Sequence, residues 1–190
     1  MFDLGSVPRL ETERLILRGW RAEDFDAFAA MMADPEVARF LTSNQLPMDR
    51  ANAWRAMALF VGHWSLRGFG LFVVEEKQSG AFVGRVGGWR PEEWIGLELG
   101  WGLARPFWGR GYAREAARAA GDWMWREIAT DEIVSLIHVD NIRSQKLAAG
   151  LGMKLARGTI HAGMPHTIWS ISRQSWQAQP VGLPDGPAQR

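Results

Sequence analysis

The sequence of 190 residues contains no cysteine. This absence excludes disulfide bonds, cysteine-ligated zinc and a covalent acyl-cysteine intermediate. The chain also lacks any run of the roughly 20 apolar residues that a membrane-spanning helix needs. Its N-terminal residues have neither the basic start nor the apolar core of a secretion signal. We therefore expect a cytoplasmic protein that does not associate with a membrane.

A strong charge of either sign is missing as well. The 22 lysine and arginine residues balance 21 acidic ones and leave a formal net charge of +1. Despite the arginines and 11 tryptophans, this balance argues against nucleic acid as a partner. The length and the apolar fraction of 47% fit one globular domain, which we expect over residues 1–178. The proline- and glycine-rich residues 179–190 are expected to form a flexible tail.

Several common catalytic and nucleotide-binding motifs do not occur. There is no GxxxxGK[ST], which excludes a P-loop, and the GxGxxG pattern fails because Arg114 stands where its third glycine is needed. Without a GxSxG sequence there is no nucleophile elbow. The four histidines are scattered and form no HExxH, so we expect no catalytic metal.

Turn signals and apolar periodicity divide the chain into short strands and amphipathic helices. Strands are expected at residues 12–20, 69–76, 81–89, 94–103, 132–139, 154–161 and 166–172. Helices are expected at residues 23–33, about 47–68, 111–128 and 141–151, with residues 37–42 as a connecting segment. In the second helix the apolar residues Trp54, Met57, Ala58 and Val61 repeat at helical spacing. The order predicts a mixed α/β fold in which helix 111–128 crosses over between two parallel strands.

The stretch of residues 97–118, LELGWGLARPFWGRGYAREAAR, joins an apolar strand to a helix through a loop that contains glycine and arginine. Gly109 and Gly111 can take positive φ and let a ligand approach the backbone closely. Arg110 adds a positive charge to the same loop. Because the first N–H groups of a helix have no partner within it, they can bind an anion. The stretch therefore predicts a phosphate or pyrophosphate site at the start of the helix.

Four segments carry a more specific resemblance, and they are TERLILR, LELGWGL, RPFWGRGYAREA and HVDNIRSQKLAAGLGM. Their order and spacing resemble the GNAT superfamily of N-acetyltransferases over roughly residues 8–176. Within it they are similar to the branch of RimJ- and RimL-like ribosomal-protein N-terminal acetyltransferases. The resemblance implies a mixed sheet of about six to seven strands with about four helices, and a V-shaped split between the fourth and fifth strands. It also implies transfer of an acetyl group from acetyl-CoA to a primary amine, either a protein N-terminus or a small molecule.

The resemblance places acetyl-CoA on particular residues of this chain. The pyrophosphate would lie on the loop that comprises Trp108, Gly109, Arg110, Gly111, Tyr112 and Ala113. The pantetheine arm would run between the strands around residues 99–103 and 133–139. There it would contact the backbone of Gly100, Trp101, Gly102 and Leu103. Asn141 matches an asparagine through which relatives contact the cofactor.

One catalytic position departs from the pattern of the superfamily. Many members have a tyrosine seven residues after that asparagine, which protonates the leaving thiolate, but here the position is Ala148. The nearby hydroxyl of Ser144 is the candidate that replaces it. The missing tyrosine keeps open an alternative, in which the chain is a CoA-binding regulatory or interaction module without transferase activity.

A base is also needed, because an ammonium must lose a proton before its nitrogen can attack a carbonyl carbon. Strand alternation places Glu98 on one face with Gly96, Gly100 and Gly102. Two interpretations of Glu98 stay open: a general base in the cleft, or a glutamate bound to an arginine across the sheet. His138 is expected to be an ordinary histidine of the sheet.

The amine acceptor does not follow from these motifs. The residues that select it are expected in the segments 40–64 and 161–166. Candidates for the border of the acceptor pocket are Trp20, Phe40, Trp64, Trp89 and Trp94, although packing in the core is the commoner role for such residues. An exposed edge among the last strands is expected to allow a homodimer.

Overall fold

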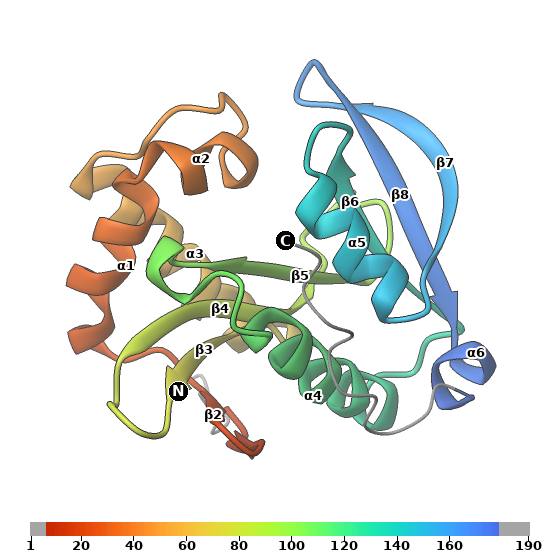
Figure 1. The fold of residues 1–190 in the computed structure, drawn as a ribbon, viewed down its shortest axis with the longest axis horizontal. Coiled ribbons are helices and arrows are strands. Elements are labelled where there is room, and N and C mark those ends of the chain that lie inside the picture. Colours follow the sequence, from red (N-terminus) through yellow and green to blue (C-terminus); the bar gives the residue numbers. More distant parts are fainter. Residues whose placement is uncertain (1–6, 179–190) are drawn as a thin grey trace.

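One eight-stranded sheet forms the centre of the protein, whose computed structural model describes residues 7–178. The strands are β1 (Leu10–Glu11), β2 (Leu15–Arg18), β3 (Leu71–Glu76), β4 (Phe82–Trp89), β5 (Glu98–Leu103), β6 (Glu132–His138), β7 (Lys154–His161) and β8 (Met164–Ser172). Their order across the sheet is β1-β2-β3-β4-β5-β6-β8-β7. Neighbouring strands are antiparallel except β5 and β6, which are parallel and are joined through the crossover helix α4 (Tyr112–Glu127; Figure 1).

Helices cover both faces of this sheet. Besides α4 they are α1 (Phe25–Ala33), α2 (Pro35–Leu41), α3 (Arg50–Arg67), α5 (Ile142–Gly150) and α6 (Arg173–Gln177), with 3-10 turns η1 (Ala22–Asp24) and η2 (Arg105–Phe107). A Cβ added to Gly102 of β5 would lie 2.6 Å from Leu41 of α2, whereas one added to Gly88 of β4 would lie 3.5 Å from Met124 of α4. Since the strand register makes these glycines point to opposite faces, α2 and α4 lie on opposite sides of the sheet (Figure 1).

Apolar side chains fill a separate core on each face. Leu99, Met124 and Ile133 are fully buried between α4 and the sheet. Phe28 and Leu71 are buried in the second core, beneath α1 and α3. Burial of these side chains away from water is the main force that fixes the helices on the sheet.

The predicted V-shaped split is confirmed between β5 and β6. Their register contains a single pair, Glu98 with Val134, and the amide of Val134 donates to the carbonyl of Leu97 at 2.9 Å. Beyond it the Ser135 hydroxyl donates to the Leu99 carbonyl at 2.7 Å, and residues 100–103 pair with β4 alone. One edge of β5 is therefore open where the strands diverge.

The structure confirms the mixed α/β class, the single domain and every expected strand and helix. The expected numbers of strands and helices were too low, since the described residues form eight strands and six α-helices. The structure adds the short strand β1 and the helices α2 and α6. Residues 37–42 are largely helical in α2 rather than a connecting segment, because Asp34 caps a new helix by accepting a hydrogen bond from the Glu36 amide. The expected tail, residues 179–190, lies outside the described residues.

The phase of α3 also differs from the spacing of its apolar residues. Trp54 and Val61 are 60% and 41% exposed, whereas Ala53, Phe60 and Trp64 face the core. Trp64 packs edge to face on Phe72 with ring centroids 4.8 Å apart. Packing against the sheet therefore selects a different face of this helix.

Candidate active site

The loop between β5 and α4 takes the backbone form that its glycines predict. Gly109 and Gly111 have φ values of 74° and 78°, in the left-handed region that favours glycine. A Cβ added to Gly109 would meet no atom within 4 Å, so there is open space beside the loop. Gly111 is the N-cap residue of α4 and supplies no side-chain cap. The first N–H groups of this 16-residue helix are therefore available to an anion.

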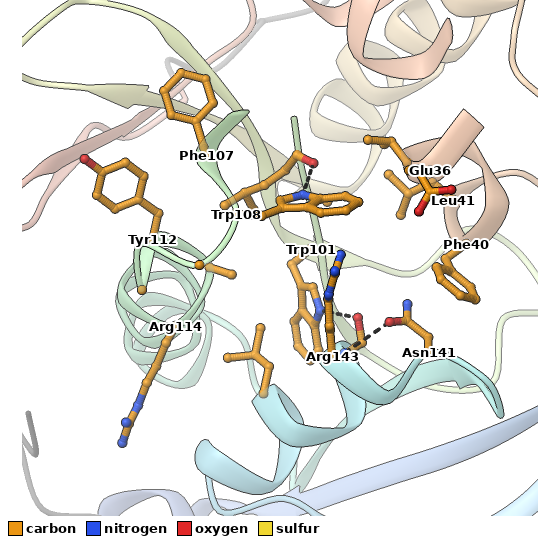
Figure 2. A pocket seen from close by; sticks show the side chains of 18 residues that line it. Glu36, Phe40, Leu41, Trp101, Phe107, Trp108, Tyr112, Arg114, Asn141 and Arg143 are labelled. Atoms are coloured by element: carbon orange, nitrogen blue, oxygen red, sulfur yellow. Dashed lines mark hydrogen bonds between the residues drawn. The ribbon is translucent and has the colours of Figure 1, made fainter. Parts of the chain in front are cut away.

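A cavity of about 280 Å³ opens beside this loop, between α2, β5 and α5 (Figure 2). The sequence-predicted residues that line it are Trp101, Gly102, Leu103, Trp108, Gly109, Gly111, Tyr112, Ala113, Asn141 and Ser144. We call it the cofactor cavity. Helix α2, which the sequence did not predict, adds Glu36, Val37, Phe40 and Leu41 to its wall.

Two of the arginines around the loop differ in their placement. Arg110, the predicted phosphate partner, does not line the cofactor cavity. Its guanidinium lies 3.7 Å from Glu76, and its side chain is 51% exposed. Arg143 of α5 lines the cavity instead, with its guanidinium 4.7 Å from the ring centre of Trp108 (Figure 2). Arg143 lies two residues after Asn141, the N-cap of α5, and this place in the sequence could have identified it as a residue of the cavity.

Trp108 contributes its ring rather than hydrogen-bond donors. Its amide donates to the carbonyl of Arg105 at 3.1 Å, and its indole N–H donates to the carbonyl of Leu103 at 2.8 Å. Both donors and the Leu103 carbonyl are thus occupied within the protein. The part of the loop that can offer amides to a phosphate begins at Gly109.

Ser144 lies at the inner end of the cofactor cavity. The side-chain oxygen of Asn141 accepts a hydrogen bond from the Ser144 amide at 3.2 Å and so caps α5. The indole N–H of Trp101 donates to the Ser144 hydroxyl oxygen at 3.1 Å. An indole N–H can only donate, so the hydroxyl is the acceptor here and keeps its own proton for another partner. Ser144 can therefore act as a proton donor within the cavity.

A second cavity of about 510 Å³ adjoins the first, and we call it the acceptor cavity. The residues that line both cavities are Phe40, Leu41, Trp101, Asn141 and Ser144. Gly100 and Glu98 line the acceptor cavity only, and so do Trp89 and Trp94. By contrast, Trp20 and Trp64 pack against the buried cores. Both segments expected to select the acceptor, 40–64 and 161–166, contribute to the wall of this cavity.

Glu98 projects from β5 into the acceptor cavity. Its carboxylate accepts a hydrogen bond from the Trp94 indole at 2.7 Å, and the Leu136 amide lies 3.5 Å away. Burial raises the pKa of Glu98 to about 7, although the bond from Trp94 opposes the shift. Within the described residues Glu98 forms no ion pair with an arginine, so the direct cross-sheet pair is not made. A carboxyl group with such a pKa can accept and release a proton near neutral pH.

Histidines occupy the far side of the acceptor cavity. His138, expected to be an ordinary histidine of the sheet, is buried and lines the cavity together with His161 and His166. Its Nδ1 accepts from the Asp140 amide at 3.1 Å, and its Nε2 lies 3.3 Å from the side-chain amide nitrogen of Gln45. Burial and the neighbouring His166 lower the pKa of His161. Between residues 7 and 178, His, Asp and Glu side chains nowhere gather in a group of three that could hold a metal ion.

Within the same described range, each helix is too short or too polar to cross a lipid bilayer.

Comparison with known proteins agrees with this geometry. Residues 14–154 match the family model described as an acetyltransferase (GNAT) domain. The uncharacterized N-acetyltransferase p20 of Bacillus licheniformis is 29% identical over 147 residues, which are 76% of this chain and 82% of that protein. The crystal structure of an acetyltransferase from Agrobacterium tumefaciens superposes with a TM-score of 0.78 at 28% identity, over 88% of this chain and 96% of that one.

The fold is also shared with a more distant protein. The ribosomal L7/L12 α-N-protein acetyltransferase RimL, solved in complex with coenzyme A, superposes with a TM-score of 0.73 at 14% identity. The match covers 88% of this chain and 99% of that one. At this identity the likeness concerns the fold alone.

Proposed function

Because this chain belongs to the acetyltransferase (GNAT) family, we propose that it moves an acetyl group from acetyl-CoA to a primary amine by direct attack in a ternary complex. Acetyl transfer is the activity of the family, and the choice of an amine acceptor is our proposal. The observation that carries it is the junction of the two cavities at Trp101 and Ser144. A donor in one cavity and an acceptor in the other would meet there.

We infer that acetyl-CoA occupies the cofactor cavity. The residues present fit its chemistry, since a pyrophosphate needs amide donors and a helix N-terminus, and the loop from Gly109 to Ala113 supplies both. Arg143 adds a positive charge to the wall. The open edge of β5 at residues 100–103 offers backbone groups to an extended pantetheine arm, and Asn141 borders the same space.

Acetyl-CoA, when bound, supplies a thioester carbonyl whose carbon a neutral amine can attack. Glu98 accepts the proton that the ammonium gives up, directly or through water, because its raised pKa is close to neutral pH. Backbone N–H groups of β5 stabilise the negative charge that develops on the carbonyl oxygen. As the new N–C bond forms and the C–S bond breaks, Ser144 donates its hydroxyl proton to the sulfur. The nitrogen loses its second proton as the amide forms, and this proton returns to Ser144 directly or through water. Products are the acetylated amine and CoA, and Glu98 returns its proton to solvent.

The test is the release of CoA from acetyl-CoA in the presence of a panel of amines that includes peptides with free N-termini. Because the chain has no cysteine, a thiol reagent reports released CoA only. We expect release that depends on the amine, and a mass increase of the amine by one acetyl group. If no amine on a broad panel is acetylated, the proposal is wrong.

Calorimetry with acetyl-CoA separates this function from the alternative of a regulatory CoA-binding module. Tight binding without transfer to any amine would favour the module, to which the comparisons lend no support. Failure to bind acetyl-CoA at all would contradict the assignment of the cofactor cavity itself.

Three further expectations are part of this proposal. The fold shared with RimL favours a protein N-terminus as one acceptor class to be included in the panel. A cytoplasmic location is expected from the same enzyme class. Strand β7 pairs with β8 alone within the described residues and exposes Leu155 and Ile160, so its edge is the expected site of a homodimer.

A further inference from the structure

We propose that Arg85 is an anion-binding residue of the acceptor cavity, and that the amine acceptor therefore carries a carboxylate. The inference rests on the proposed function and extends it to a substrate class. It concerns small amino-carboxylates with an apolar body.

The position of Arg85 places its charge inside the acceptor cavity. Arg85 lies on β4 opposite Gly102 and faces the same side of the sheet as Glu98 and Trp89. The side chain lines the acceptor cavity, and its guanidinium carbon is 4.8 Å from the ring centre of Phe60.

Within residues 7–178 no group accepts a hydrogen bond from the guanidinium of Arg85. Its buried Nε makes no hydrogen bond, and within residues 7–178 no carboxylate forms an ion pair with it. Burial lowers the pKa of Arg85 to about 10, and only the nearby charge of Glu98 opposes this shift. At neutral pH the group thus remains a half-buried cation with unused N–H donors. Contact with the Phe60 ring offsets part of the cost but occupies none of the donors.

The other ionisable groups around the cavity do not balance this charge. Among residues 7–178, Glu98 is the sole acidic residue that lines it, and burial keeps that carboxyl partly protonated near pH 7. The remaining titratable groups are the three histidines, which are neutral or positive. A ligand with a negative charge should therefore bind beside Arg85 more tightly than a neutral ligand of the same shape.

The arrangement of the two groups favours a carboxylate on the same small molecule as the amine. Glu98 and Arg85 project from neighbouring strands on the same face of the sheet and line the same cavity, so one ligand can place its amine at Glu98 and an anionic group at Arg85. Guanidinium and carboxylate groups match in a planar, two-bond geometry. Phe60, Trp89 and Trp94 complete the wall with aromatic surface, which suits an apolar side chain on the ligand.

A binding experiment tests this inference without turnover. Calorimetry on the CoA-saturated protein would compare N-acetylphenylalanine with N-acetylphenylalaninamide, which differ in the carboxylate alone. We expect the carboxylate to bind at least about 10-fold more tightly to the unchanged protein. Arg85→Met should abolish this preference, Arg85→Lys should retain part of it, and Arg126→Met, on the exposed face of α4, should leave it unchanged.

Equal binding of the two ligands by the unchanged protein would overturn the proposal, and so would a preference that survives Arg85→Met. Stronger binding of N-acetylphosphoethanolamine than of the carboxylate would overturn the choice of carboxylate. The affinity for CoA should be the same in all variants, which would confirm that they fold. If Arg85→Met does not fold, the carboxylate preference of Arg85→Lys tests the proposal, because it should be smaller than that of the unchanged protein.

Kinetics distinguish the failure of this inference from the failure of the proposed function. Phenylalaninamide and other amines without a carboxylate could be acetylated as efficiently as phenylalanine. This result would leave the transferase function intact and exclude the proposed role of Arg85. Selective carboxylate binding without acetylation of any amine would support the anion site while contradicting the transferase function.

Discussion

The indole N–H of Trp101 donates to the hydroxyl oxygen of Ser144 across the open end of the β5–β6 split, at 3.1 Å. This bond joins a residue of the sheet to the first turn of α5, and both residues line both cavities. It fixes the hydroxyl oxygen at their junction and leaves the hydroxyl proton unused by Trp101. In the mechanism that we propose, this hydroxyl is the acid that Ala148 cannot supply.

Replacement of Ser144 by alanine should lower kcat by about 10- to 100-fold, in the lower part of the range for general acid catalysis because water can replace the hydroxyl. The KM for acetyl-CoA should change by less than about threefold, since the hydroxyl acts on the leaving group. Steady-state kinetics with a thiol reagent measure both values. Ser170→Ala, on β8 and outside both cavities, is the matched control. An unchanged kcat in Ser144→Ala would assign the proton to water instead.

The Glu98→Gln substitution should lower kcat/KM at pH 8 by about 100-fold or more, because an amide cannot accept the proton of the ammonium. In the unchanged protein, activity should rise with pH through about 7, the pKa to which burial raises Glu98. The variant should lose this step and keep only the rise due to the amine itself. Glu93→Gln, in the exposed turn before β5, is the control. A pH profile that is the same in both variants would exclude Glu98 as the base.

The raised pKa of Glu98 also predicts a pH dependence of stability. Below its ordinary pKa of 4.5 the carboxyl is protonated in both the folded and the unfolded chain. As pH rises from 4.5 to about 7, the unfolded chain loses this proton first, so the group lowers the free energy of unfolding. Urea denaturation at pH 5 and pH 8 should show a smaller difference in Glu98→Gln than in the unchanged protein. An identical difference in both proteins would indicate that Glu98 titrates normally.

Gly109→Ala should weaken CoA binding by about 10-fold and lower the free energy of unfolding by about 1 kcal/mol, because alanine resists a φ of 74°. Open space around the added Cβ means that backbone strain alone causes the loss of stability. Gly62→Ala, within α3 and also free of contacts, should instead raise stability by up to about 1 kcal/mol and leave CoA binding unchanged. Calorimetry and urea denaturation measure the two quantities. Equal CoA affinity in both variants would show that the loop does not hold the cofactor.

Local signals were sufficient for the cofactor half of the site. The glycines at 109 and 111 predicted left-handed backbone and a helix start, and the structure has both. These features depend on a few neighbouring residues, so they can be derived from sequence. Helix α2 carried an equally local signal, since Asp34 and Pro35 are a typical cap and first residue of a helix. The same two residues also end the expected helix 23–33, and this role hides the start of a second helix.

The acceptor half depends on contacts between distant segments. Arg85 becomes significant because the register of β4 and β5 places it beside glycines and turns it toward Phe60 of α3. Likewise α3 has apolar residues on several faces, and only packing against the sheet selects the face with Ala53 and Phe60 over that with Trp54. Periodicity within one segment cannot supply either result.

The buried ion pairs of Arg18 should contribute strongly to stability. Its guanidinium binds both oxygens of Asp24, at 2.8 and 2.7 Å, and also Glu75 at 2.6 Å, and these bonds raise its pKa. They join β2 to the start of α1, next to the helices that border the acceptor cavity.

Asp24→Asn removes one charge and leaves Arg18 only partly compensated in a buried site. The expected loss is about 3 kcal/mol in the free energy of unfolding. Asp26→Asn breaks the exposed pair with Arg50, also 2.7 Å long, and should cost less than about 1 kcal/mol. Urea denaturation of the two variants at neutral pH measures the difference. Equal losses would mean that burial adds nothing to the Arg18 pair, and that α1 is held by its apolar face alone.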